Sequence, residues 1–229
     1  MAIRWKGIVG AGFTPAEFDS YCHTLTWPAW RPGFLVLHNT SIPTLAQRPN
    51  GFRRQHMLDL EHYYRDVQEW NAGPHLFVDD KRIWVFTPLT VSGVHSPSWN
   101  KLSLGVEMLG EYATESFTTG RGLNVRHNTI AALATLSAVL GLAPATIRLH
   151  KEDPKTSHKG CPGKNVVKAE IIDAVQELLI DRHSAEAVLA RRALAPAAAR
   201  QQREENLRRK ELLLLLPDFP AQQLPLNPS

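Results

Sequence analysis

With 229 residues, of which 43% are hydrophobic, the chain can form one sizeable globular domain with an appendage. Its 26 lysines and arginines against 22 acidic residues give a net charge of +4, too small and too scattered an excess to indicate a nucleic-acid partner. Two cysteines exclude a disulfide-rich framework. The sequence has no run of about 18 apolar residues that could span a membrane. Its first residues lack the apolar core of a secretory signal, so we expect synthesis in the cytoplasm.

The first seventy residues predict an arm, a strand, a loop and a helix. We interpret residues 1–32, which are rich in proline and aromatic residues, as an arm with one short helix that begins at Pro15. Residues 33–41 contain a buried strand that ends in a histidine and small polar residues. Residues 42–51 carry turn-forming residues and predict a loop that shapes access to a site. Apolar residues at helical spacing predict an amphipathic helix over residues 53–70.

The middle of the chain predicts three strands and a helix. Residues 74–80 and 82–86 are two strand-like runs separated by a turn, which is typical of a β-hairpin with Asp80 and Lys81 at its tip. Residues 103–109 form a further strand, which is apolar except for one carboxylate. A strongly apolar helix is expected over residues 128–140, with Gly141 as its stop signal.

The last part of the chain predicts a short strand at residues 146–150 and an amphipathic helix at residues 166–180. Strands interleaved with helices indicate an α/β fold, with a central mixed sheet flanked by helices. Composition changes after Arg182, so we expect a main domain at residues 1–182 and a helical extension at residues 183–229.

The extension is rich in alanine, leucine, arginine and glutamine. We expect its helix to break at Pro196 and to end at Pro217. Residues 212–216 are five consecutive leucines, which we expect to dock on the main domain, on a second copy of the chain or on a lipid surface.

Two histidines and a cysteine form the most informative set in the sequence. His38 and His150 each follow an apolar strand, and Cys161 lies in a tight loop between glycine and proline. A lone histidine at a strand end can equally be a hydrogen-bonded core residue, but a cysteine in such a loop favours a thiolate ligand. Together the three predict a zinc site whose fourth position stays open for water, as in catalytic zinc sites.

Glu107 and Lys159 are the candidate catalytic side chains. A carboxylate in an apolar strand is costly unless it is paired or functional, so Glu107 is either a proton acceptor or a salt-bridge partner, for example of Arg148. Lys159 precedes Cys161 by two residues, where an ammonium group would stabilise an oxyanion beside the metal. Alternatively, it is one of several surface lysines of this loop.

These residues stand in segments that resemble a known family. The segments are Leu37-His38-Asn39-Thr40, residues 74–78, 93–95 and 99–107, and His150 with residues 159–163. In this order they are similar to motifs of the zinc-dependent N-acetylmuramoyl-L-alanine amidases of type 2, a family that includes phage endolysins and is similar to the peptidoglycan recognition proteins. The resemblance covers roughly residues 30–180.

The resemblance implies hydrolysis of the amide between N-acetylmuramic acid and the first L-alanine of the peptidoglycan stem peptide. It implies one zinc ion per chain on His38, His150 and Cys161, with Lys159 as the catalytic lysine. Some members carry a tyrosine where this chain has Pro74, whereas others use a glutamate at the position of Glu107. The sequence therefore resembles the glutamate-using subset.

The implied mechanism has zinc lowering the pKa of its water toward about 7. Glu107 acts as general base and then as general acid, and Lys159 holds the oxyanion. The candidate substrate contacts are His75, His95, Asn39 and Trp99. The two histidines could equally support metal ligands or be core or surface residues.

Three functions remain open. The first is a phage or prophage endolysin, made in the cytoplasm and acting on the cell wall in the periplasm. The second is a cytoplasmic amidase that recycles muropeptides, and the third is a module that binds peptidoglycan without cleaving it. Retention of the three ligand candidates with Glu107 and Lys159 argues against the third.

Overall fold

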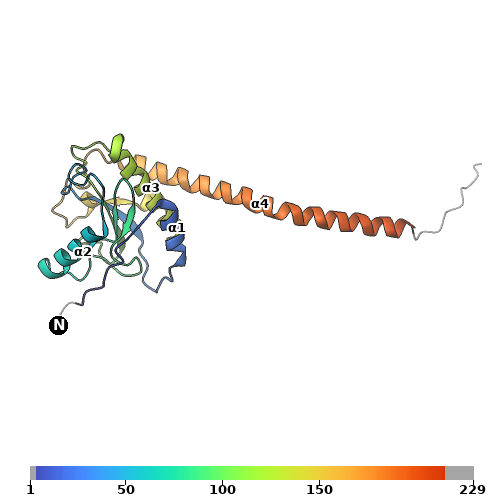
Figure 1. The fold of residues 1–229 in the computed structure, drawn as a ribbon, viewed down its shortest axis with the longest axis horizontal. Helices are drawn as coiled ribbons and strands as arrows, with labels where there is room; N and C mark the ends of the chain where they lie inside the picture. Colours follow the sequence, from blue (N-terminus) through green and yellow to red (C-terminus); the bar gives the residue numbers. More distant parts are fainter. Residues whose placement is uncertain (1–3, 215–229) are drawn as a thin grey trace, which may run out of the picture. The chain divides into compact units, whose positions relative to one another are not determined.

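The computed structural model describes residues 4–214 and centres on a six-stranded mixed sheet (Figure 1). The strands are β1 (Ala11–Phe13), β2 (Phe34–Asn39), β3 (Leu76–Val78), β4 (Ile83–Val85), β5 (Ser103–Met108) and β6 (Arg148–Leu149), in the order β1-β4-β3-β5-β2-β6. Strand β2 runs parallel to β5 and β6, and β3 runs parallel to β5. The pairs β1–β4 and β3–β4 are antiparallel, which confirms the predicted hairpin and the mixed sheet.

Within residues 4–180, helices flank this sheet, as predicted for an α/β fold. The helical elements of the described chain are α1 (Pro15–Thr24), α2 (Arg54–His62), the π-helical turn η1 (Tyr63–Val67), α3 (Gly120–Leu140), the 3₁₀ turns η2 (Pro144–Thr146) and η3 (His150–Glu152), and α4 (Lys168–Leu214). Helices α1 and α3 lie side by side (Figure 1), and the Thr135 hydroxyl of α3 donates to Asp19 of α1 at 2.8 Å.

Local sequence signals set two of these helix ends. Thr14 and Glu17 form a reciprocal capping box at the start of α1, with Pro15 in the first turn. Gly141 ends α3 in the left-handed conformation with φ of 67°, as its position in the sequence predicted.

Strand β2 is buried on both faces, which explains its unbroken apolar sequence. Leu35 and Leu37 belong to the main core, whereas Phe34 and Val36 pack with Trp99 in a smaller cluster. Alternate residues of a strand share one face of the sheet, so His38 lies on the same face as Phe34 and Val36. Its neighbour in register on β5 is Glu107. The strand therefore carries His38 to the cluster face at its carboxyl end.

Several predicted boundaries were wrong. Strand β1 lies in the segment interpreted as an irregular arm, and α3 begins eight residues before the predicted start. The region predicted as one helix at residues 53–70 is α2 followed by the π-helical turn η1. Strand β6 has two residues, because His150 already belongs to a 3₁₀ turn.

Helix α4 also corrects the prediction for the extension, because it continues through Pro196. Alanines surround this proline on both sides, and their high helix propensity opposes the loss of one main-chain hydrogen bond. Residues 215–217, which include the end of the leucine run and Pro217, lie outside the described residues.

The described residues form two compact units, one up to Ile180 and one from Asp181. Within the described residues, no helix combines the length and the apolarity that crossing a membrane requires.

Candidate metal centre

Four side chains with metal-ligand or acid–base chemistry gather at the carboxyl ends of neighbouring strands. His38 is the penultimate residue of β2, Glu107 stands beside it on β5, and His150 follows β6 directly. Cys161 lies in the loop before α4, and its carbonyl accepts a hydrogen bond from Lys151 N–H at 3.0 Å. The carboxyl edge of parallel strands is where α/β proteins place their sites.

The structure brings the three predicted metal ligands together. The ligand atoms of His38, His150 and Cys161 lie within 4.8 Å of one another. Two imidazole nitrogens and one sulfur match the preference of zinc, and three protein ligands leave one position of a tetrahedral site free. The donor set therefore fits a catalytic zinc ion.

Hydrogen bonds orient both histidine ligands. His38 Nε2 lies 3.1 Å from His95 Nδ1, and His95 Nε2 faces the Ser103 carbonyl at 3.4 Å. His150 Nε2 lies 2.8 Å from the Thr156 hydroxyl. Because Nε2 of His38 and Nε2 of His150 are both engaged, Nδ1 is left as the candidate ligand atom of each ring. Hydrogen-bond partners such as His95 and Thr156 fix the tautomer of a metal-binding imidazole.

Burial and neighbouring groups shift the pKa values of the three candidate ligands in different directions. Desolvation, with the nearby His95, holds the pKa of His38 well below its usual value. Burial and the nearby His158 lower the pKa of His150 to about 4, so both rings are neutral at pH 7 and ready to bind a metal. Burial and the Glu107 carboxyl raise the pKa of the Cys161 thiol to about 12, so this group must lose a proton when a cation binds.

Glu107 is positioned for proton transfer. Its Oε1 lies 3.8 Å from Nδ1 of His38, and its side chain is only 16% exposed. Desolvation raises the pKa of the Glu107 carboxyl to about 8. The alternative salt bridge with Arg148 does not form, because the Arg148 guanidinium lies 4.0 Å above the ring of Phe34 and 4.9 Å from that of Trp99.

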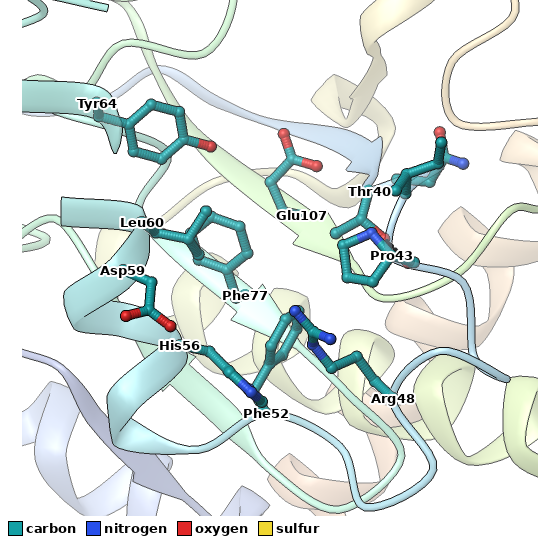
Figure 2. A pocket seen from close by; sticks show the side chains of 12 residues that line it. Thr40, Pro43, Arg48, Phe52, His56, Asp59, Leu60, Tyr64, Phe77 and Glu107 are labelled. Carbon is teal, nitrogen blue, oxygen red and sulfur yellow. Dashed lines mark hydrogen bonds between the residues drawn. The ribbon is translucent and has the colours of Figure 1, made fainter. Parts of the chain in front are cut away.

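A cavity of about 520 Å³ opens over the three ligands. Its walls include Glu107, Tyr64, His158 and Asn39. A second cavity of about 300 Å³ shares Asn39, Tyr64 and Glu107 with the first. Figure 2 shows Tyr64 and Glu107 among the side chains that line this second cavity. The two cavities therefore adjoin at these residues.

Lys159 lies outside both cavities. Its exposed side chain donates from Nζ to the main-chain oxygen of Asp153 at 3.1 Å. The Asp153 carboxylate in turn accepts hydrogen bonds from the Ser96 hydroxyl and from Ser98 N–H. These bonds tie the loop that carries Cys161 to the segment that follows His95.

The predicted substrate contacts occupy different positions. Asn39 lines both cavities, and its amide donates to the Gly110 carbonyl at 3.0 Å. His95 lines the larger cavity, but its Nδ1 is engaged in the contact with Nε2 of His38. His75 is fully buried, and its ring nitrogens are bonded to Val91 O and Gly105 N, an internal structural arrangement. Trp99 is buried beneath Arg148, away from both cavities.

Sequence reasoning missed two residues of the site. Tyr64 belongs to the π-helical turn η1. Its side chain lines both cavities and lies near Glu107. His158 lines the larger cavity, and its ring stacks on His150 with 5.5 Å between centroids. No motif marks Tyr64, whereas the closeness of His158 to Cys161 in sequence was an available signal.

Comparisons with known proteins agree with this geometry. Residues 29–164 match the family described as Amidase_2, N-acetylmuramoyl-L-alanine amidase. No curated protein sequence matches the chain.

Among solved structures, wild-type PGRP-LB from Drosophila has a TM-score of 0.50 at 19% identity, over 65% of this chain and 84% of that one. The endolysin N-acetylmuramoyl-L-alanine amidase LysCS from Clostridium intestinale URNW has a TM-score of 0.48 at 21% identity, over 67% and 92% of the two chains. A mutant endolysin from Bacillus subtilis has a TM-score of 0.48 at 22% identity, over 65% and 90%.

The family match spans more than half of the chain and includes His38, Glu107, His150 and Cys161. This protein is therefore a member of the N-acetylmuramoyl-L-alanine amidase family of type 2.

Proposed function

We propose that the protein is a zinc-dependent amidase that cleaves the bond between N-acetylmuramic acid and L-alanine in peptidoglycan. The observation that carries this proposal is the convergence of His38, His150 and Cys161, whose ligand atoms lie within 4.8 Å of one another beside Glu107. Three ligands with one position free distinguish a catalytic from a structural zinc site. Family membership supplies the substrate class.

Each residue has a specific task in this proposal. Bound zinc would polarise the scissile carbonyl and lower the pKa of water at the site. Glu107 takes a proton from the attacking water and transfers it to the nitrogen of the departing alanine. A carboxyl whose pKa lies near the working pH suits both steps, and burial brings that of Glu107 to about 8. His95 and Thr156 hold the two imidazole ligands in position.

We assign Lys159 to stabilisation of the tetrahedral oxyanion, on the resemblance of its position two residues before Cys161. In the structure, its Nζ donates to the Asp153 carbonyl. The side chain therefore has to turn from this carbonyl toward the cavity when substrate binds. An ammonium group there would stabilise the developing negative charge.

The biological setting we propose is host lysis by a phage or prophage endolysin. A recycling amidase that prefers small anhydro-muropeptides is the second candidate, and a binding module is the third. The ligand trio together with Glu107 favours an enzyme over a binding module, because binding alone requires no buried carboxylate beside metal ligands.

We further propose that the segment after Ser184 aids self-association or attraction to an anionic envelope, on its leucine and arginine content. Residues up to Ile180 form their own compact unit, so a protein truncated after residue 182 is a fair test. The proposal requires truncation to change the oligomeric state or the lysis of intact cells. Unchanged values for both would refute it.

Two substitutions test the catalytic roles. Glu107→Gln and Lys159→Ala should leave about one zinc ion per chain but abolish the release of amino groups from suspended murein. Neither side chain belongs to the ligand trio, so zinc content is the internal control. Wild-type turnover in both variants would refute the assigned roles.

A further inference from the structure

Two separate segments of the chain support the imidazole ligands of the metal centre. Residues 93–100 carry His95, which contacts His38, and residues 150–161 carry His150 with its partner Thr156. A cavity of about 360 Å³ has residues of both segments in its walls. The segments therefore need a fixed connection if both imidazoles are to keep their geometry at one metal ion.

The carboxylate of Asp153 supplies this connection. Its Oδ2 accepts hydrogen bonds from the Ser96 hydroxyl and, at 2.9 Å, from Ser98 N–H. Within residues 4–214, these are the only hydrogen bonds that join the two segments. Asp153 is fully buried, and charged hydrogen bonds are stronger in such surroundings than at the surface.

On one side, this connection reaches the ring of His38 through His95. The side-chain oxygen of Asn100 accepts from the N–H groups of His95 and Ser96, both at 2.7 Å. The resulting turn holds His95 beside Ser96, and His95 Nδ1 lies 3.1 Å from His38 Nε2. Releasing Ser96 from Asp153 would therefore loosen the ring that orients His38.

On the other side, Asp153 holds the partner of His150. Its N–H donates to the His150 carbonyl at 2.9 Å, where the 3₁₀ turn η3 ends. Its Oδ1 accepts from Lys155 N–H at 2.8 Å, and its main-chain oxygen accepts from Thr156 N–H at 3.2 Å. These bonds place the Thr156 hydroxyl 2.8 Å from His150 Nε2.

The contacts of Asp153 also keep its carboxylate charged. Burial opposes ionisation, but the hydrogen bonds from Ser96 and Ser98 outweigh it and hold the pKa of Asp153 well below its usual value. The charged acceptor that joins the two segments is therefore present at neutral pH.

We propose that Asp153 is a positioning residue that fixes the geometry of both imidazole ligands at once. It holds the partner of His38 on one segment and the partner of His150 on the other. The inference rests on the proposed zinc site, and it gives a role to a residue that touches neither zinc nor substrate. Because one carboxylate joins the segments, its hydrogen bonds and the affinity for zinc should be energetically coupled.

The test is zinc affinity, measured by competition with a chromophoric chelator on protein whose folding is checked by circular dichroism. Asp153→Ala should lower this affinity by about tenfold or more, the effect expected when the support of metal-binding histidines is lost. Asp153→Asn keeps an oxygen for Ser96 and Ser98 and should recover part of the loss. Ser96→Ala should lower the affinity by itself but cause no further loss in the Asp153→Ala protein, where the bond is already absent.

Asp79→Ala is the matched control, because it removes an equally buried carboxylate that lines neither cavity at the metal centre. This variant should lose stability but keep the wild-type affinity for zinc. Equal losses of affinity in the two alanine variants, or a folded Asp153→Ala protein with wild-type affinity, would overturn the proposal.

The remaining variants keep the proposal open to refutation if Asp153→Ala does not fold. Ser96→Ala removes a single hydrogen bond of the connection, so wild-type zinc affinity in this variant would also overturn the proposal. Additive losses for Ser96→Ala and Asp153→Ala would do the same. Failure of the proposed function itself would look different, because the wild-type protein would then bind no zinc.

Discussion

His38 and His95 are joined by a contact of 3.1 Å between Nε2 and Nδ1, which orients His38 in the candidate metal centre. If His95 keeps its proton on Nε2, toward the Ser103 carbonyl, its Nδ1 accepts from His38. His38 then presents an unprotonated Nδ1 on the side of Glu107, at 3.8 Å from the carboxylate. One hydrogen bond thus fixes both the tautomer and the direction of a ligand.

Replacing His95 should therefore weaken zinc binding without removing a ligand. We expect His95→Leu to lower zinc affinity by about 10- to 100-fold, the usual effect of losing such a partner. His95→Gln keeps an acceptor for His38 and should lose less. Competition with a chromophoric chelator measures both, and a folded Leu variant with wild-type affinity would contradict this role.

Asp79 should be a stability determinant separate from the site. Its buried carboxylate accepts four hydrogen bonds, from the main-chain N–H groups of Phe52, Lys81 and Arg82 and from the indole of Trp84. Asp79→Ala leaves these donors unpaired and should lower the free energy of unfolding by about 3 kcal/mol or more. Asp79→Asn keeps an acceptor and should cost less. Urea denaturation tests this, and a loss below about 1 kcal/mol for the alanine variant would be inconsistent with it.

Stability should fall in mild acid because His75 is buried in its neutral form. Desolvation lowers its pKa to about 4, whereas a histidine in the unfolded chain titrates near 6.5. Between these values the unfolded state binds more protons, so stability is full above pH 6.5 and declines as the pH falls toward 4.

The contribution of His75 should reach roughly 1.4 kcal/mol per pH unit within that window. Urea unfolding of metal-free protein across the window measures the slope, and His75→Gln should make it shallower. An identical slope in the variant would show that His75 does not cause the acid sensitivity.

The sequence was sufficient to predict that His38, His150 and Cys161 come together, and to predict much of the sheet. His38 lies at the end of β2 and His150 directly follows β6, and parallel strands bring their carboxyl ends together, so local patterns already implied proximity. The hairpin and the stop at Gly141 depend on equally local signals. For these features, neighbouring residues in the chain determine the structure.

Features that depend on distant contacts were not predictable. Arg148 stacks on Phe34 and Trp99, which neither the strand pattern nor its charge indicated. Tyr64 reaches the site through a π-helical turn that no local motif marks. Such arrangements depend on tertiary packing, which overrides local preference.

Mass spectrometry of purified murein digested by the zinc-loaded protein tests the central claim most directly. We expect stem peptides with a free amino group on L-alanine and glycan strands that retain a free lactyl carboxylate. Products cut at glycosidic bonds or within the peptide, or intact murein, would contradict it.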